Sequence, residues 1–185
     1  PLNVRLRLAV ERLWLTLCWR NVDEFVVQTQ TMKSLIRSKF CRHVPVRDIP
    51  FVAVPDGYLR TLQKEGSRIE ADFDFVYIAS GEPHKNHQRL IDAWCLLAEE
   101  GIFPSICVTL DEVRFAGLSC LIEKARQQFG IKITNVGSLS HNDALALLSK
   151  SGAAIYPSKF ESFGLPLIEA RQAGLPVLAS ELDYV

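Results

Sequence analysis

The chain of 185 residues has few cysteines and no net charge, and each of these facts argues against certain classes of protein. The five cysteines are odd in number, and their spacings match no zinc or redox motif. We therefore expect reduced thiols, several of them buried, as in a cytoplasmic protein. The 21 basic and 21 acidic residues cancel, so the chain as a whole does not indicate nucleic-acid binding.

Long apolar runs and a glycine fingerprint are also missing. No apolar run reaches the length of a membrane span. No Gly-x-Gly-x-x-Gly follows a predicted strand, which argues against a plain dehydrogenase. His84 and His87 are too few to hold a metal by themselves, and the cysteines are not placed to help. We expect no metal and no cofactor, and we expect His87 and His141 at the surface, each at the start of a helix.

The remaining composition is that of a globular protein, with 48% hydrophobic and 23% charged residues. The length allows one well-buried domain, or one domain with an appendage. Charge is unevenly spread: residues 1–60 carry ten basic and five acidic residues, a balance of +5, and the rest carries −5. The chain starts at Pro1 and stops soon after a strand-like segment, so we expect it to be a fragment of a longer protein.

From residue 74 onward, apolar strand-like runs alternate with helix-like runs. The predicted strands are 75–80, 105–110, 132–136, 153–157 and 177–180, and the predicted helices are 87–100, 118–129, 141–149 and 165–173. Nearly continuous apolar strands that alternate with helices are typical of a parallel sheet covered on both faces. The sequence therefore predicts an α/β fold with a Rossmann-like sheet.

The first 60 residues are less regular. The pattern predicts a helix over 3–20, a strand over 23–29, a helix over 31–40 and a short strand over 51–54. Thr31 is the expected cap of the second helix. The segment with Pro45, Pro50 and Pro55 is the best candidate for a linker.

Ligands of parallel sheets bind where the strands end at their carboxyl edge. Four loops follow predicted strands there, at 81–86, 111–114, 137–138 and 158–164. The last loop leads into a helix that begins near Pro166 and stops at Gly174, which places Glu161 before the helix and Glu169 inside it. Helix-start amides bind anions, and carboxylates accept hydrogen bonds from hydroxyls. Hydroxyls beside a phosphate are the features of a nucleotide sugar.

The wider pattern carries a family resemblance. Its residues are Tyr156, Pro157, Ser158, Glu161, Phe163, Gly164, Leu165, Pro166, Glu169, Ala170, Gly174, Pro176 and Val177, with Gly81, Lys85, Asn86, Leu90, Ile91 and Ala93 upstream. This pattern, from about residue 75 to residue 180, resembles the retaining glycosyltransferases of the two-domain GT-B fold, in particular family 4. The resemblance is specific for the fold and for the class of donor, and it is silent on the acceptor.

The resemblance implies roles for particular residues. Lys85 and Glu161 would be the catalytic residues: Lys85 would meet the donor phosphates, and Glu161 would hold hydroxyls of the donor sugar. Glu169 would hold the ribose. The other donor-binding residues that the resemblance implies are Gly81, Asn86, Val136, Gly137, Ser162, Phe163, Gly164 and Leu165. Glu82 departs from the family, where an arginine is common after the glycine, so another base such as Lys159 or Arg114 would have to compensate.

By the same resemblance, residues 51–185 form the donor-binding domain, truncated at its C-terminus, and residues 1–50 are the tail of the acceptor-side domain with a linker. The expected reaction transfers a sugar with retention from a nucleoside diphosphate to a saccharide or lipid-linked acceptor, in polysaccharide or glycoconjugate synthesis. This fragment alone should bind the donor and catalyse poorly or not at all. The basic, apolar helix over 3–20 has two interpretations: a peripheral contact with a membrane, or a core helix of the missing half.

There are three alternatives to this function, of which two are enzymes and one is a binding module. A GT-B epimerase or phosphorylase would share the fold, and a regulatory module would bind the nucleotide sugar without chemistry, an idea that Glu82 favours. A glycoside hydrolase needs two carboxylates that flank one bond, about 5–10 Å apart. Because Glu161 lies in a loop and Glu169 along a helix, we disfavour the hydrolase.

Overall fold

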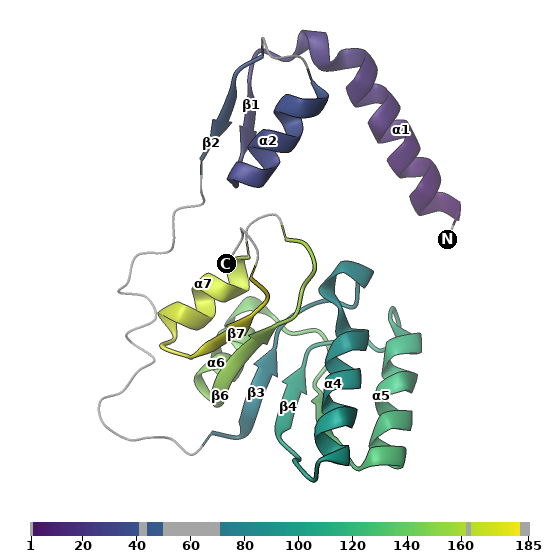
Figure 1. Ribbon diagram of the computed structural model, residues 1–185, viewed down its shortest axis with the longest axis vertical. Coiled ribbons are helices and arrows are strands. Elements are labelled where there is room, and N and C mark those ends of the chain that lie inside the picture. The colour runs from purple at the N-terminus through teal and green to yellow at the C-terminus, as the bar shows by residue number, and fades with distance from the viewer. Residues whose placement is uncertain (1, 41–43, 50–70, 162–163, 182–185) are drawn as a thin grey trace. The chain divides into compact units, whose positions relative to one another are not determined.

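The computed structural model describes residues 2–40, 44–49, 71–161 and 164–181. These residues fall into two compact units, the first within residues 2–49 and the second within residues 71–181. Each unit has its own parallel sheet (Figure 1). The strand expected over 51–54 lies outside the described residues.

The first unit is a β-α-β arrangement preceded by a long helix. Helix α1 (Leu2–Cys18) continues into the 3₁₀ turn η1 (Trp19–Asn21). Strands β1 (Phe25–Val27) and β2 (Val46–Asp48) pair in parallel, and helix α2 (Gln30–Lys39) connects them, as a parallel pair requires. Side chains join these elements: Phe40 stacks on Phe25 with the ring centres 5.7 Å apart, and Lys33 forms an ion pair with Asp48.

The structure corrects two predictions for this unit. Thr29 caps α2 in place of Thr31, because its hydroxyl accepts a hydrogen bond from the amide of Met32 at 3.2 Å, as an N-cap side chain does. Strand β2 occupies part of the segment that was expected to be a linker. Its pairing with β1, with Val46 opposite Phe25, is a tertiary contact that the local sequence does not reveal.

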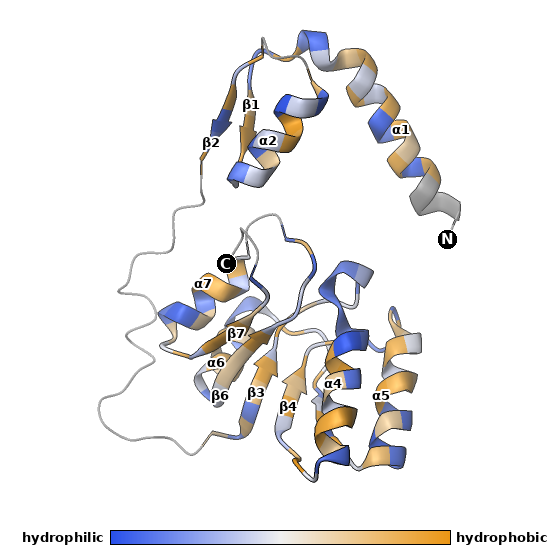
Figure 2. Cartoon of the chain, viewed as in Figure 1, coloured by the Kyte–Doolittle hydropathy of each residue, from blue (hydrophilic) through white to orange (hydrophobic). Residues whose placement is uncertain are grey.

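Helix α1 exposes six large apolar side chains among its described residues. They are Leu6, Leu8, Val10, Leu13, Trp14 and Leu17. All but Leu8 lie on one face of the helix, because Leu6, Val10, Leu13 and Leu17 recur every three or four residues and Trp14 follows Leu13. Figure 2 shows apolar and charged residues mixed along the helix. Both interpretations of this helix, the membrane contact and the core of a missing half, need such a face, and both stay predictions.

The second unit is a five-stranded parallel sheet. Its strands are β3 (Phe73–Tyr77), β4 (Ser105–Val108), β5 (Lys132–Asn135), β6 (Ser151–Tyr156) and β7 (Val177–Ala179). They lie in the order β5-β4-β3-β6-β7, and all neighbours are parallel. The helices are α4 (His87–Glu99), α5 (Ala116–Phe129), α6 (His141–Ser149) and α7 (Leu165–Gln172). The α/β class and the alternation of strands and helices are confirmed, with some ends shifted by one to three residues.

Helices cover both faces of this sheet, as predicted. Successive side chains of a strand point to opposite faces, and β3 shows this alternation. Val76 packs in a core cluster with Leu145 and Leu148 of α6 and Ala170 of α7. Its neighbour Phe75 meets the ring of Trp94 of α4 edge to face, with 5.6 Å between ring centres. Helix α5 lies beside α4 (Figure 1).

The strand order determines where a ligand can bind. The chain runs from β3 outward to β4 and β5, and it then returns to place β6 on the other side of β3. The order therefore reverses between β3 and β6, and in parallel sheets the carboxyl ends of the strands at such a switch point are where a ligand is expected to bind. The loops that follow β3 and β6 are those with the expected catalytic residues.

Candidate functional site

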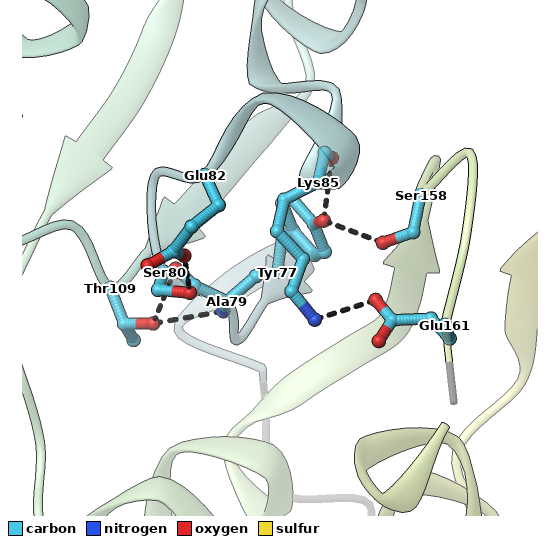
Figure 3. Close-up of polar contacts among 8 residues, drawn as sticks. All are labelled: Tyr77, Ala79, Ser80, Glu82, Lys85, Thr109, Ser158 and Glu161. Atoms are coloured by element: carbon cyan, nitrogen blue, oxygen red, sulfur yellow. Dashed lines mark hydrogen bonds and ion pairs between the residues drawn. The ribbon is translucent and has the colours of Figure 1, made fainter. Parts of the chain in front are cut away.

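Lys85 and Glu161 lie in direct contact at the switch between β3 and β6. The ammonium of Lys85 is 2.6 Å from a carboxylate oxygen of Glu161 (Figure 3). Their side chains are only 16% and 10% exposed, so Lys85 is not a solvated surface lysine. Lys85 ends the 3₁₀ turn η2 (Pro83–Lys85), which directly precedes α4. The structure thus brings together the two residues for which the sequence predicts a catalytic role.

Asn86 fixes the end of the same loop. Its backbone is left-handed, with φ 63° and ψ 31°, a conformation that asparagine tolerates better than most residues. Its side-chain amide donates a hydrogen bond to the carbonyl of Pro157 at 2.9 Å, across to the loop after β6. In this structure Asn86 joins the two loops, and its predicted contact with the donor stays a prediction.

Glu169 lies on α7, partly covered by its surroundings. Burial raises the pKa of its carboxyl, and the nearby imidazole of His141 opposes this rise. Nδ1 of His141 is 3.6 Å from a carboxylate oxygen of Glu169. His141 is exposed at the start of α6, as predicted, but the contact with Glu169 makes it a neighbour of the expected ribose site.

The loop after β6 ends at Gly164, where α7 begins. Gly164 is the residue before the helix and has φ 76°, a value that glycine adopts without strain. Leu165 is the first helical residue, and Pro166 lies in the first turn, where its missing N–H costs nothing. Gly164 and Leu165 therefore stand at the start of α7, as the sequence predicts, and their donor contact stays a prediction. Ser162 and Phe163 lie outside the described residues.

Gly81 is buried beneath the ring of Phe115. A Cβ atom at position 81 would lie 2.4 Å from the nearest carbon of that ring, which is closer than real side chains approach. The absence of a side chain thus lets the loop after β4 pack on the loop after β3. This packing is sufficient reason for a glycine here, and the donor contact predicted for Gly81 stays a prediction.

Glu82 forms an ion pair with Arg114 from the loop after β4, with 3.0 Å between the guanidinium and the carboxylate. It also accepts a hydrogen bond from Ser80. Although burial opposes the shift, these hydrogen bonds and charges together lower the pKa of the Glu82 carboxyl, so it is ionised at neutral pH. Arg114 is one of the two bases expected to compensate for Glu82, and it lies beside it.

A pocket of about 220 Å³ opens at the same edge of the sheet. Residues from the loops after β3, β4 and β5 line it, among them Ser80, Thr109, Arg114, Phe115 and Ser138. Val136 and Gly137 precede Ser138 in the loop after β5. The amide of Val136 donates to the carbonyl of Val108 at 3.0 Å, and Gly137 adopts φ 75°. Two of the four predicted loops, 111–114 and 137–138, therefore contribute residues to one pocket, and the chain directly after β3 lines it with residues 78–80.

His87 is buried, and the prediction that it lies at the surface is wrong. The sequence predicts a surface residue, whereas its side chain is only 3% exposed, and its ring packs on Tyr77 with 4.8 Å between ring centres. Burial lowers its pKa from 6.5 to about 4, the charge of Lys85 adds to this effect, and Glu82 opposes it. His87 is therefore neutral at pH 7. Its periodicity in α4 is the signal that could have placed it in the core, since Leu90, Ile91 and Trp94 of the same helix are buried.

The described cysteines differ in their exposure to solvent. Among the four cysteines that the structure describes, only Cys107 is buried, so the prediction of several buried thiols is wrong for this part of the chain. The described residues include no cluster of three or more His, Cys, Asp or Glu side chains that could hold a metal ion. None of the described helices has the length and apolar character to cross a membrane.

Known proteins resemble this chain in sequence. A model of the family described as glycosyl transferases group 1 matches residues 60–185. A glycogen synthase of Mycobacterium tuberculosis is 43% identical over 63 residues, which are 34% of this chain and 15% of that protein. The O-antigen chain mannosyltransferase RfbU of Salmonella typhimurium is 41% identical over 108 residues, 58% of this chain and 30% of that protein. The chain thus matches less than a third of the length of either curated relative.

The fold resembles solved structures as well. The pneumococcal O-GlcNAc transferase GtfA, crystallised with UDP and GlcNAc, superimposes with a TM-score of 0.67. The superposition covers 92% of this chain and 32% of that one, at 20% sequence identity, so it supports the fold alone. The fold is the one expected from the resemblance to GT-B glycosyltransferases, and the family match covers most of the chain. The chain belongs to the family of glycosyl transferases group 1.

Proposed function

We propose that this chain binds a nucleoside-diphosphate sugar as the donor-binding part of a retaining glycosyltransferase, which transfers the sugar to a hydroxyl of a saccharide or lipid-linked acceptor. The contact between Lys85 and Glu161 at the switch between β3 and β6 is the observation that carries this proposal. The family match supports the same class of reaction. The O-antigen chain mannosyltransferase among the relatives supports a place in polysaccharide synthesis.

Lys85 is suited to stabilise the leaving group. When the bond between the anomeric carbon and a phosphate oxygen breaks, the electron pair stays on the departing diphosphate. A fixed positive charge beside that phosphate lowers the free energy of the transition state. The ammonium of Lys85 has three donors, and its contact with Glu161 uses one, so it can bind a phosphate oxygen as well. Loss of a donor of this kind typically lowers the turnover number by about 10²–10³.

The two glutamates divide the polar part of the ligand between them. Glu161, held by Lys85, would accept hydrogen bonds from hydroxyls of the donor sugar. Glu169, which lies on α7 beside His141, would accept hydrogen bonds from the ribose hydroxyls. The amides at Gly164 and Leu165 add the positive potential of a helix start.

The contact of Glu82 with Arg114 supports the idea that Arg114 compensates for the negative charge of Glu82 near the donor phosphates. A lone carboxylate in this loop would repel a diphosphate, but Glu82 is paired with Arg114 and hydrogen-bonded to Ser80. Arg114 is largely exposed and lines the pocket at the strand ends, so its remaining N–H groups are accessible to an anion. We assign Arg114 the role of the second cation for the donor phosphates.

The proposal includes three statements that are predictions about the whole protein. No cofactor or metal takes part, nucleic acid is not a partner, and the enzyme works in the cytoplasm. The four described cysteines are free thiols, which a reducing compartment maintains. We expect this chain to bind the donor and to be inactive by itself, with the acceptor bound by residues outside it.

A thermal-shift screen against nucleoside diphosphates and their sugars tests the proposal. A ligand that binds only the folded chain stabilises it, by about 2.7 kcal/mol at a hundred times its Kd. We expect UDP or GDP to raise the melting temperature, with UDP tried first because GtfA was crystallised with it. Lys85→Met should lose most of this shift, and Lys124→Met, an exposed lysine of α5, should keep it. If millimolar nucleotides produce no shift in the wild type, the chain is a scaffold that does not bind nucleotides.

A further inference from the structure

Tyr77 and Ser158 are two fully buried hydroxyl residues behind the Lys85–Glu161 contact. Both are 0% exposed. Tyr77 ends β3, and its hydroxyl donates a hydrogen bond to the backbone carbonyl of Lys85 at 2.7 Å. The same hydroxyl is 3.1 Å from Oγ of Ser158 in the loop after β6 (Figure 3). The buried phenol therefore touches both loops that carry the proposed catalytic side chains.

The direction of these hydrogen bonds follows from the number of protons. A phenol has one hydroxyl proton, and Lys85 has only a carbonyl oxygen to offer at this point, so the proton of Tyr77 must lie between these two atoms. The bond between the two hydroxyls is then donated by Ser158 and accepted by Tyr77. The result is a directed chain from Ser158 through Tyr77 to the backbone of Lys85, in which each bond polarises the next.

Two further contacts join the same two loops. The side chain of Asn86 donates to the carbonyl of Pro157 at 2.9 Å, and the amide of Lys159 donates to the carbonyl of His84 at 2.8 Å. Both contacts need the loops to lie at a fixed separation. Tyr77 differs from the other members of this set because its side chain comes from the end of a strand, β3, which gives it a rigid support, whereas Ser158 lies two residues beyond β6.

We propose that Tyr77 and Ser158 are positioning residues, which fix the loop after β3 against the loop after β6 so that Lys85 and Glu161 meet at the distance needed for donor binding. The inference deepens the proposed function and rests on it. A displacement of about 1 Å at such a site can reduce function by up to about a hundredfold, so a pair of buried hydrogen bonds is a sensitive point of control. Neither hydroxyl needs to touch the donor.

The test uses Tyr77→Phe and Ser158→Ala in the 185-residue chain, with calorimetric titration of UDP and GDP. Trp94→Phe is the matched control, because Trp94 also donates a buried aromatic hydrogen bond, at 2.8 Å to the carbonyl of Pro104, but it does so before β4, at the opposite edge of the sheet. We expect Tyr77→Phe to weaken the nucleotide about tenfold and Ser158→Ala to weaken it similarly. Trp94→Phe should lower the melting temperature and leave the affinity unchanged.

A mutant cycle separates positioning from general destabilisation. If Tyr77 acts through Lys85, Tyr77→Phe should cause no further loss of UDP affinity when Lys85→Met is already present. Hydrogen exchange supplies a readout without any ligand: in Tyr77→Phe the amide of Lys159, which bonds to the neighbouring loop, should exchange faster, while amides in the core of β4 keep their protection.

Distinct results would overturn the two proposals. Wild-type affinity in Tyr77→Phe, or an equal loss in Trp94→Phe, refutes the positioning role while the proposed function stands. Unchanged protection of the Lys159 amide in Tyr77→Phe refutes it as well, whether or not a nucleotide binds. Failure of the wild type to bind any nucleoside diphosphate refutes the proposed function, and the role of Tyr77 and Ser158 in donor binding falls with it.

Discussion

The ammonium of Lys85 and the carboxylate of Glu161 lie 2.6 Å apart, although 76 residues separate them in the chain. The contact exists because β6 returns to pair with β3, with Phe75 opposite Ala153 in the register. In the free protein the two charges neutralise each other in a largely buried setting. A donor phosphate would then bind to an ammonium that is already held in place, which reduces the ordering cost of binding.

We expect Lys85→Met and Glu161→Gln to lower the free energy of unfolding each by about 1–3 kcal/mol, because each change leaves a partly buried polar partner unsatisfied. The double variant should lose less than the sum of the two, since it leaves no unpaired charge. Urea denaturation of the four proteins measures this cycle. Strictly additive losses would show that the contact contributes nothing to the stability of the free protein.

The glutamates should differ in the ligands they affect. Glu169→Gln should weaken UDP and the UDP-sugar to a similar degree, since both contain ribose. Glu161→Gln should weaken the UDP-sugar by about 1.5–3 kcal/mol and should weaken UDP less, because the carboxylate would meet the sugar directly and would affect the phosphate only through Lys85. Paired calorimetric titrations decide between these outcomes, with the bound nucleotide sugar taken from the initial screen. Equal losses for both ligands at Glu161, or no loss at Glu169, would overturn the assignment of the two residues.

Glu169→Gln should also stabilise the free protein at neutral pH. Burial raises the pKa of Glu169, so the folded chain binds its proton more tightly than the unfolded chain does and the ionised form is the less stable one. A neutral glutamine avoids this cost, and we expect a gain of up to about 1 kcal/mol at pH 7. The gain should disappear below the unfolded-state pKa of 4.5, where both states are protonated. Unfolding curves of the wild type and the variant at pH 4 and pH 7 measure this difference in the free energy of unfolding. A less stable variant at pH 7, or an equal gain at both pH values, would contradict the prediction.

Buried His87 should make the chain sensitive to acid. Its pKa falls from 6.5 in the unfolded chain to about 4 in the fold, so between these values the unfolded state binds more protons and stability falls as the pH decreases. The full loss, reached below pH 4, is about 3 kcal/mol, from a shift of about 2.5 pKa units. His87→Leu should remove this part of the pH dependence. Denaturation at several pH values gives the slope of the free energy of unfolding against pH for the wild type and for His87→Leu. Equal slopes would mean that His87 does not titrate as described.

Gly81→Ala should destabilise the chain by about 1–3 kcal/mol, as overpacking of a close contact does. The new methyl group would overlap the ring of Phe115. Phe115→Ala removes that ring, so Gly81→Ala should cost little when Phe115→Ala is already present. Melting temperatures of the two single variants and the double variant measure the effect. A loss of nucleotide affinity without a loss of stability would instead favour the direct donor contact first predicted for Gly81.

Much of the second unit follows from the sequence. Apolar runs such as 105–110 and amphipathic runs such as 141–149 have the periods of a buried strand and of a helix, and these periods depend on local backbone geometry alone. Because parallel strands all end at one edge, the order of elements also places Lys85 and Glu161 at that edge. The sequence thus determined the class of fold and the set of loops that form the candidate site.

Which residues touch was decided by the tertiary structure. The burial of His87, the pairing of Glu82 with Arg114 and the contact of Tyr77 with Ser158 join residues that come together only after β3 has paired with β4 on one side and β6 on the other. Periodicity carries no information on strand order, and a hydrogen bond between residues 81 positions apart depends on that order and on the register. The sequence therefore determined which loops form the candidate site, and the packing of the sheet decided how their side chains are held.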